Sequence, residues 1–118
     1  MKTKARLFSM LICLLSLGGC RSRGINVTVT NTGDQPIRNL EVDYPGGSFG
    51  RPVIEANNLF HYRVKITRDG QMKLLFVESN GREHHENGPH VHAGDDGQMT
   101  VTIDRDGNNT WQADVQGK

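Results

Sequence analysis

Residues 60–67, with the sequence FHYRVKIT, alternate strictly between apolar and polar side chains. The apolar positions are Phe60, Tyr62, Val64 and Ile66. Successive side chains of a β-strand point to opposite faces of the sheet, so this pattern predicts a strand with one face on a hydrophobic core. We therefore expect the aromatic ring of Tyr62 to be buried.

The same alternation recurs along the rest of the chain. It is found in residues 25–30 (INVTVT), 40–44 (LEVDY), 98–103 (QMTVTI) and 111–115 (WQADV). Strands with one apolar and one polar face are typical of antiparallel sheets that cover a core on one side. Trp111 shares the parity of Ala113 and Val115, so we expect it in that core.

Two segments depart from simple alternation. Residues 72–77 (MKLLFV) are apolar on both faces after Lys73, which predicts a strand at the centre of a sheet. Ile37 does not share the parity of Leu40 and Val42, so we expect a β-bulge or a late strand start near it.

Turn-forming dipeptides separate these segments. Asp69-Gly70, Asn80-Gly81 and Asp106-Gly107 each stand between strand-like runs, and such pairs accept the positive φ angles of tight hairpins. Residues 31–36 (NTGDQP) form a further polar turn. Helical periodicity is absent after residue 20. The sequence therefore predicts an all-β fold, a small antiparallel β-sandwich over residues 25–118.

Two stretches carry a family resemblance. VTVTNTGDQPIRNLEV (residues 27–42) and FVESNGREHHE (residues 76–86) resemble segments of the Ig-like domains found in bacterial surface and adhesion-related proteins. The resemblance implies an Ig-like sandwich that serves as a spacer or a binding module. It carries over no catalytic residues.

The first 19 residues have the composition of an export signal. Lys2, Lys4 and Arg6 precede the apolar run LFSMLICLLSL at residues 7–17. Because a transmembrane helix needs about 20 apolar residues, this run is too short to span a bilayer and is typical of a cleavable signal. A plain secretory signal with an incidental cysteine is the alternative to a lipoprotein signal.

Residues 17–20, Leu-Gly-Gly-Cys, resemble the lipobox of bacterial lipoproteins. The resemblance implies cleavage between Gly19 and Cys20 and a lipid on Cys20, with residues 20–24 as a short tether. Two or three acyl chains would hold the protein stably on a membrane, since one chain gives only marginal binding. Arg21 stands where an aspartate would resemble an inner-membrane retention signal, which favours the outer membrane, facing the periplasm, in a Gram-negative cell.

Composition excludes several functions for the 99 residues that follow the signal. Three of the 14 basic residues lie in the signal, which leaves 11 against 13 acidic ones and no basic stripe for nucleic acid. The two cysteines are Cys13, in the signal, and Cys20. The domain therefore has no disulfide, catalytic thiol or thiolate metal site.

Residues 46–50, Gly-Gly-Ser-Phe-Gly, match the pattern of a nucleophile elbow with Ser48 at its centre. A strand precedes it, but the residues that follow have loop character instead of the helix that an elbow requires. We therefore predict a connecting loop and no enzymatic activity.

Four of the five histidines fall within residues 84–92. If Asn87-Gly88-Pro89 forms a three-residue turn, Glu86 pairs with His90 and His84 pairs with His92, on one face. His84, Glu86, His90 and His92 would then suit zinc or copper(II), with His85 pointing away. The alternative is an exposed polar loop without metal.

The sequence thus predicts a lipid-anchored envelope protein whose sandwich is a non-catalytic binding or structural module, with an envelope protein or a glycan as partner. The alternative is a periplasmic lipoprotein that binds zinc or copper through the histidine segment.

Overall fold

The computed structural model describes residues 23–117, which form eight β-strands and no helix. The strands are β1 (Ile25–Asn31), β2 (Ile37–Tyr44), β3 (Gly47–Ile54), β4 (Leu59–Val64), β5 (Gly70–Val77), β6 (Glu83–Val91), β7 (Asp96–Ile103) and β8 (Asn109–Gln116). The predicted signal peptide and Cys20 lie outside the described residues. Within residues 23–117, no helix has the length and apolarity that crossing a bilayer requires.

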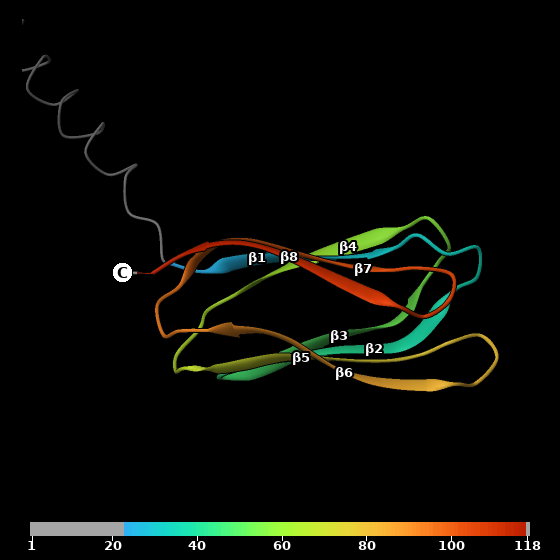
Figure 1. The fold of residues 1–118 in the computed structure, drawn as a ribbon, viewed down its shortest axis with the longest axis horizontal. Helices are drawn as coiled ribbons and strands as arrows, with labels where there is room; N and C mark the ends of the chain where they lie inside the picture. The colour runs from blue at the N-terminus through green and yellow to red at the C-terminus, as the bar shows by residue number, and fades with distance from the viewer. Residues whose placement is uncertain (1–22, 118) are drawn as a thin grey trace, which may run out of the picture.

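The strands form two four-stranded sheets that face each other as the layers of a sandwich (Figure 1). One sheet has the order β4-β1-β7-β8 and the other the order β3-β2-β5-β6. All neighbouring strands are antiparallel except β1 and β7, which run parallel from the pair Ile25–Gly97 to the pair Asn31–Ile103. The predicted all-β sandwich is confirmed, with one parallel pair in an otherwise antiparallel architecture.

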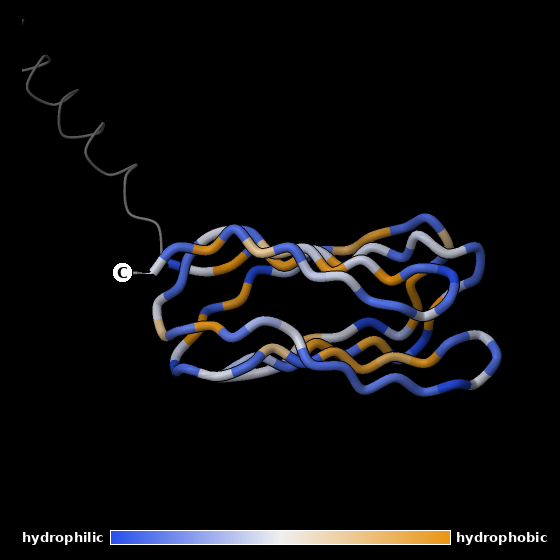
Figure 2. The backbone as a smooth tube through the Cα atoms, in the orientation of Figure 1, coloured by the Kyte–Doolittle hydropathy of each residue, from blue (hydrophilic) through white to orange (hydrophobic). Residues whose placement is uncertain are grey.

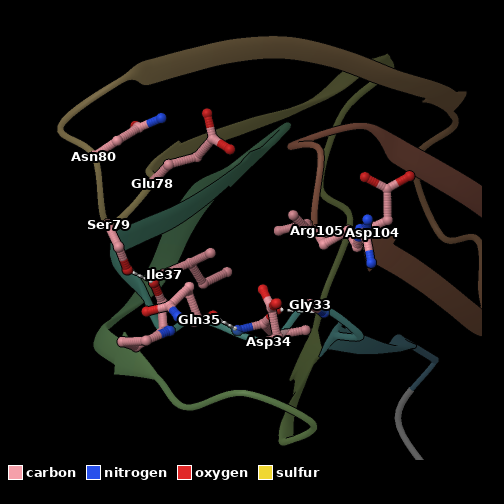
Figure 3. Close-up of a pocket in the computed structure, with 12 residues that line it drawn as sticks. Gly33, Asp34, Gln35, Ile37, Glu78, Ser79, Asn80, Asp104 and Arg105 are labelled. Carbon is pink, nitrogen blue, oxygen red and sulfur yellow. Dashed lines mark hydrogen bonds between the residues drawn. The ribbon is translucent and has the colours of Figure 1, made fainter.

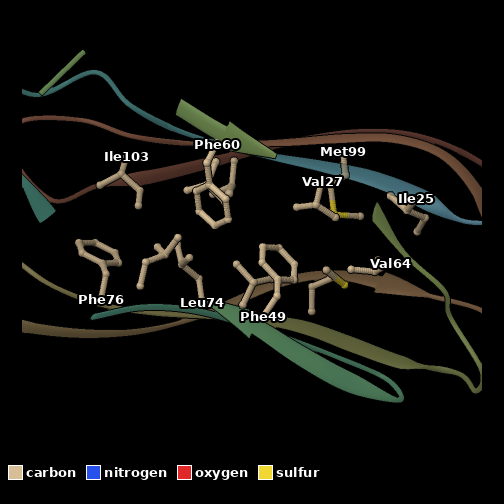
Figure 4. Packing of buried hydrophobic residues seen from close by; sticks show 14 of the residues in the cluster. Ile25, Val27, Phe49, Phe60, Val64, Leu74, Phe76, Met99 and Ile103 are labelled. Carbon is tan, nitrogen blue, oxygen red and sulfur yellow. The ribbon is translucent and has the colours of Figure 1, made fainter. Parts of the chain in front are cut away.

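The core lies between the two sheets, where the apolar faces of their strands meet. Figure 2 shows that hydrophobic residues recur along the strands of both layers, and Figure 4 shows side chains of the core cluster between the two layers. Ile25, Val27 and Val29 are fully enclosed, as their alternation predicts. Burying an aliphatic side chain of this size contributes about 1.5–3 kcal/mol to the free energy of folding, so this strand is a major stabilising element.

The segment predicted to be central is confirmed as β5, which lies between β2 and β6. Its Met72, Leu74 and Phe76 are buried in the core, and its Leu75 and Val77 are half-buried on the outer face. The bulge expected near Ile37 is also present. The pairing of β2 with β5 shifts register between Arg38 and Glu41, and Asn39 between them has a φ of 50°.

Two of the three predicted hairpin turns are confirmed. Asn80-Gly81 joins β5 to β6 and Asp106-Gly107 joins β7 to β8, with φ angles of 88° and 80° at the two glycines. Asp69-Gly70 is instead part of the crossover from β4, in one sheet, to β5, in the other. The hairpin predicted there is wrong, because Asp69 accepts a hydrogen bond from the distant Ala93 N–H instead of closing a local turn.

The loop predicted around Ser48 is also wrong. Residues 47–54 form strand β3, which is joined to β2 by a two-residue turn at Pro45-Gly46. Gly46 has a φ of 112°, and proline followed by a glycine with positive φ is the sequence of a type II turn. The hairpin brings Phe49 into the core, where 9% of its surface is exposed.

One open side of the sandwich, between β3 and β4, is closed by aromatic side chains. The ring of Phe49 lies 5.8 Å from that of Phe60 and 5.0 Å from that of Tyr62. Tyr62 stacks on Phe49 but is 51% exposed, so its predicted burial is wrong. The reason is that β4 is an edge strand, where an inward-pointing side chain can reach solvent past the end of the layer.

Trp111 closes the opposite side, between β6 and β8. Its indole lies so close to Gly88 that a β-carbon there would be 2.7 Å from the ring. Trp111 packs against the core but is only half-buried, which corrects the prediction of a core residue.

The strand ends and connections fall into two groups at opposite ends of the sandwich. We call the end formed by residues 23–24, 45–46, 65–69 and 92–95 the anchor end. We call the end formed by residues 32–36, 55–58, 78–82 and 104–108 the cleft end. This division follows from the strand directions, because β1, β3, β5 and β7 all run from the anchor end to the cleft end.

Candidate functional site

The histidine segment does not form the predicted hairpin. Residues 83–91 are the single strand β6, which pairs antiparallel with β5, His84 opposite Phe76 and His90 opposite Gln71. Pro89 is tolerated because β6 is an edge strand and the register shifts beside it, where the Gln71 amide donates to the Gly88 carbonyl. The turn predicted at Asn87–Pro89 is therefore wrong, since the chain already reverses at Asn80-Gly81.

The four predicted ligands are consequently split into two groups. Six residue steps along the strand separate His84 from His90, a distance of roughly 20 Å. His84 and Glu86 lie towards the cleft end, whereas His90 and His92 lie at the anchor end. No group of three or more histidine, cysteine, aspartate or glutamate side chains suited to a metal ion occurs among residues 23–117. The shared face on which the four-ligand hypothesis depended is absent.

His84 is almost enclosed. Its ring stacks on Phe76 with centroids 4.4 Å apart and planes inclined by 7°. Its Nε2 atom lies 2.8 Å from Glu78 Oε2, and its Nδ1 atom lies 3.6 Å from Glu86 Oε1. His85 points to the opposite face and is exposed, as predicted. The sequence pattern missed Glu78 as the partner of His84, because the two residues meet across the β5–β6 hairpin.

The second histidine pair lies at the anchor end. The rings of His90 and His92 are 5.1 Å apart in an edge-to-face arrangement, and His92 Nδ1 lies 3.4 Å from Asp69 Oδ2. The pKa of Asp69 is held below its ordinary value of 3.8, first by the hydrogen bond from the Ala93 N–H and then by His92. This arrangement ties the 65–69 connection to the 92–95 turn.

A cleft of about 330 Å³ opens at the cleft end, between the two sheets (Figure 3). Asp34, Gln35 and Pro36 come from the turn after β1. Glu78, Ser79 and Asn80 come from the β5–β6 hairpin, and Asp104 and Arg105 from the β7–β8 hairpin. In Figure 3, Gln35 and Ser79 lie on one side, Asp104 and Arg105 on the other, and Asp34 between them. Ile37 and Ile103, together with Pro36, add apolar surface to the lining.

Asn31 organises one wall of the cleft from beneath. It is 1% exposed, and its side-chain amide donates to the carbonyls of Gln35 and Ile54 at 2.8 and 3.1 Å. Its Oδ1 atom accepts from the Gly33 N–H at 2.9 Å. From the sequence, residue 31 was expected in a polar turn, and this role was not predicted. The sequence did hold a signal for its burial, because the alternation of β1 places Asn31 on the same inward face as Val27 and Val29.

The other walls are also fixed by hydrogen bonds. The Ser79 hydroxyl donates to the Pro36 carbonyl at 2.6 Å, which joins two of the three contributing segments. Asp104 Oδ1 accepts from the N–H groups of Asp106 and Asn108, which shapes the β7–β8 turn. A cleft with walls fixed in this way is preformed and does not need to assemble on binding.

Ser48, the centre of the nucleophile pattern, lies exposed near the start of β3. His90 lies in the same sheet but three strand spacings away, roughly 14 Å. His84 lies towards the other end of the sandwich. Neither histidine is within hydrogen-bonding reach of Ser48, which a general base for this serine would require.

Comparisons with known proteins bear on the fold alone. No family model matches the chain, and no curated protein matches it. Among solved structures, the chain is similar to an NMR structure of a protein from Eubacterium rectale, with a TM-score of 0.56 and 9% identity over 80% of this chain and 93% of that one. At that identity the likeness shows a shared sandwich fold.

Proposed function

We propose that the protein is a lipid-anchored lipoprotein of the bacterial envelope, whose β-sandwich is a non-catalytic, Ig-like binding module. The site that we assign to binding is the cleft between residues 31–37, 78–80 and 103–105. Its partner is a polar envelope component, either a polypeptide or a glycan. In a Gram-negative cell the protein would be held on the outer membrane, facing the periplasm.

One observation carries this proposal: Arg23 and the cleft lie at opposite ends of the sandwich. Arg23 follows Cys20 by three positions, and its side chain bonds to Gly94 at the anchor end. The cleft is formed by connections at the other end. A lipid on Cys20 would therefore leave the cleft facing away from the membrane, where a partner can reach it.

The lining of the cleft supports a polar partner. Carboxylates, amides and a hydroxyl lie beside apolar surface, a mixture of groups typical of sites that orient a ligand through a few hydrogen bonds. Ser48 lies far from both His84 and His90, so neither can act as its general base. This distance supports a binding role over a hydrolytic one.

The anchor is tested by metabolic labelling with a fatty acid. Label should enter the wild-type protein and should be absent from Cys20→Ser, which should leave the membrane fraction or accumulate uncut. A wild-type protein that never takes up label would contradict the lipoprotein assignment.

The binding site is tested with a photo-crosslinking amino acid placed in the protein in living cells. A crosslinker at Asn80, on the rim of the cleft, should give a discrete adduct, whereas one at Glu41, on the outer face of β2, should not. Digestion of the adduct with a protease or with a muramidase then distinguishes a polypeptide from a glycan. Equal adducts from both positions, or none from Asn80, would contradict the proposed site.

A further inference from the structure

The start of the described chain is fastened to the anchor end by several hydrogen bonds. Arg23 Nε donates to the Gly94 carbonyl at 2.7 Å, and its Nη2 donates to the carbonyls of Gln116 and Gly117. The Gly24 N–H donates to Asp96 Oδ1 at 3.1 Å, and its carbonyl accepts from the Gly97 N–H. The position at which the chain leaves the sandwich is therefore fixed.

The chain between this point and Cys20 is short. Two residues, Arg21 and Ser22, separate Cys20 from Arg23. Three fully extended residue steps span at most about 11 Å. If Cys20 carries lipid, as proposed above, the anchor end can move no further than this from the membrane surface.

The two ends of the sandwich differ in charge. The connections of the cleft end carry five acidic residues, Asp34, Glu55, Glu78, Asp104 and Asp106, against the two basic residues Arg82 and Arg105. The anchor end carries three basic residues, Arg23, Lys65 and Arg68, against Asp69 and Asp95. The cleft end is therefore acidic and the anchor end is weakly basic.

Both acids of the anchor end accept hydrogen bonds from the protein itself. Asp95 is 5% exposed and accepts a hydrogen bond from the His92 N–H at 2.8 Å. Asp69 accepts from the Ala93 N–H and faces His92. Lys65 and Arg68, by contrast, are exposed on the 65–69 connection. Lys65 and Arg68 are therefore exposed cations of this end that the protein itself does not bind through an acid of the same end, whereas the exposed Asp69 is engaged by Ala93 and His92.

We propose that the anchor end is a lipid-facing surface, on which Lys65 and Arg68 contact anionic headgroups. The membrane's negative surface potential attracts basic side chains within a Debye length, about 8 Å at physiological salt, and repels the acidic cleft end. The short tether and the charge asymmetry both favour an orientation with the anchor end at the membrane. The sandwich stands upright, with its cleft an eight-residue strand, about 26 Å, further from the bilayer.

The test uses the full lipidated protein in vesicles. Outside the signal the chain has Cys20 as its sole cysteine, and lipidation consumes that thiol, so a single introduced cysteine can be labelled selectively. A fluorophore at Thr67→Cys, in the anchor end, should be strongly quenched by headgroup-attached quenchers. A fluorophore at Asn80→Cys, in the cleft end, should be weakly quenched, and phosphatidylglycerol should increase the difference relative to phosphatidylcholine alone.

Neutralising variants separate docking from tethering. Lys65→Gln and Arg68→Gln should each weaken association with phosphatidylglycerol vesicles about fivefold at low salt, measured by vesicle flotation of the unlipidated protein without residues 1–20. Arg82→Gln, at the cleft end, is the matched control and should change nothing. Equal quenching at positions 67 and 80, or quenching at 67 that ignores both lipid charge and these variants, would overturn the proposal. A protein that carries no lipid would give a different result, because the wild type would then not float with phosphatidylcholine vesicles.

Discussion

Glu78 and His84 form an enclosed pair, with Oε2 of the carboxylate 2.8 Å from Nε2 of the ring and side chains only 16% and 10% exposed. The pair spans the β5–β6 hairpin, and Gly107 of the β7–β8 turn lies directly against it. A β-carbon on Gly107 would lie 2.8 Å from His84 Nε2 and 2.9 Å from Glu78 Oε1. This contact joins two of the three connections that line the cleft.

Glu78→Ala should lower the free energy of unfolding by about 1–3 kcal/mol, because it leaves a largely buried ring nitrogen without its partner. The matched control is Glu83→Ala, which removes an exposed partner 3.9 Å from His85 and should change stability by no more than about 0.5 kcal/mol. Urea unfolding of the Cys20→Ser protein measures both. Equal effects of the two substitutions would contradict the structural role of the enclosed pair.

Asn31→Ala should also cost about 1–3 kcal/mol, since it leaves the carbonyls of Gln35 and Ile54 and the N–H of Gly33 without this partner. Hydrogen exchange should accelerate at Gly33, where the wall of the cleft loses its support. Asn26→Ala, on the opposite face of the same strand, loses an exposed bond to Arg63 and should have little effect. Unchanged exchange at Gly33 in Asn31→Ala would argue against Asn31 as the organiser of the turn.

The pKa of Asp69, held below its ordinary value of 3.8 by the Ala93 N–H and then by His92, predicts a pH dependence. Since the folded protein binds this proton less readily than the unfolded chain, the carboxylate stabilises the fold above pH 3.8. That contribution is lost as the pH falls through the lowered pKa. The stability difference between wild type and Asp69→Asn should therefore be largest near neutral pH and should shrink below pH 3.8.

Glu41 should show the opposite sign. Its neighbour Asp43, two positions along the exposed face of β2, raises the pKa of Glu41 above its ordinary value of 4.5 by like-charge repulsion. The ionised form is thus disfavoured in the fold, so Glu41→Gln should stabilise the protein at neutral pH. The gain should vanish as the pH falls below 4.5. Urea unfolding across this pH range checks both signs, and a Glu41→Gln protein less stable than wild type at pH 7 would contradict the repulsion.

Phe49→Ala should be more damaging than Tyr62→Ala, although the sequence pattern favours Tyr62 as the core residue. Phe49 is enclosed among Tyr44, Phe60 and Tyr62, so its removal should cost about 3–5 kcal/mol. Tyr62 is about half exposed and should cost about 1.5–2.5 kcal/mol, roughly half of the value for full burial. Thermal or urea unfolding of the two variants gives the order directly, and the reverse order would place Tyr62 in the core after all.

The split of the histidines changes what a metal titration should show. Any uptake of zinc or copper(II) that uses His90 and His92 should be lost in His90→Ala and preserved in His84→Ala, because roughly 20 Å of strand separates the two groups. Calorimetry at pH 7.5 measures both variants, with His85→Ala as the exposed control. Equal losses in His84→Ala and His90→Ala would restore the single four-ligand site predicted from the sequence.

The strands that the sequence predicts are those with one face packed against the core. β1, β4 and β7 have uninterrupted apolar alternation because each turns that side towards the facing sheet. β3 and β6 are edge strands, rich in glycine or in histidine and glutamate, and their partly exposed positions impose no such pattern. The cleft was not predictable for a related reason. Its residues come from three connections distant in sequence, and the buried Asn31 that supports them resembles an ordinary turn residue.

The parallel pairing of β1 with β7 has a mechanical consequence. β1 is the first strand after Gly24, and it lies inside its sheet, bonded to β4 on one side and to β7 on the other. A pull on the chain before Gly24 runs along the length of β1, across the perpendicular hydrogen bonds of its antiparallel ladder with β4 and the slanted ones of its parallel ladder with β7. Both ladders are then loaded in shear, and their bonds share the force instead of opening one after another. The strand nearest the tether, β1, therefore resists extraction from the sandwich.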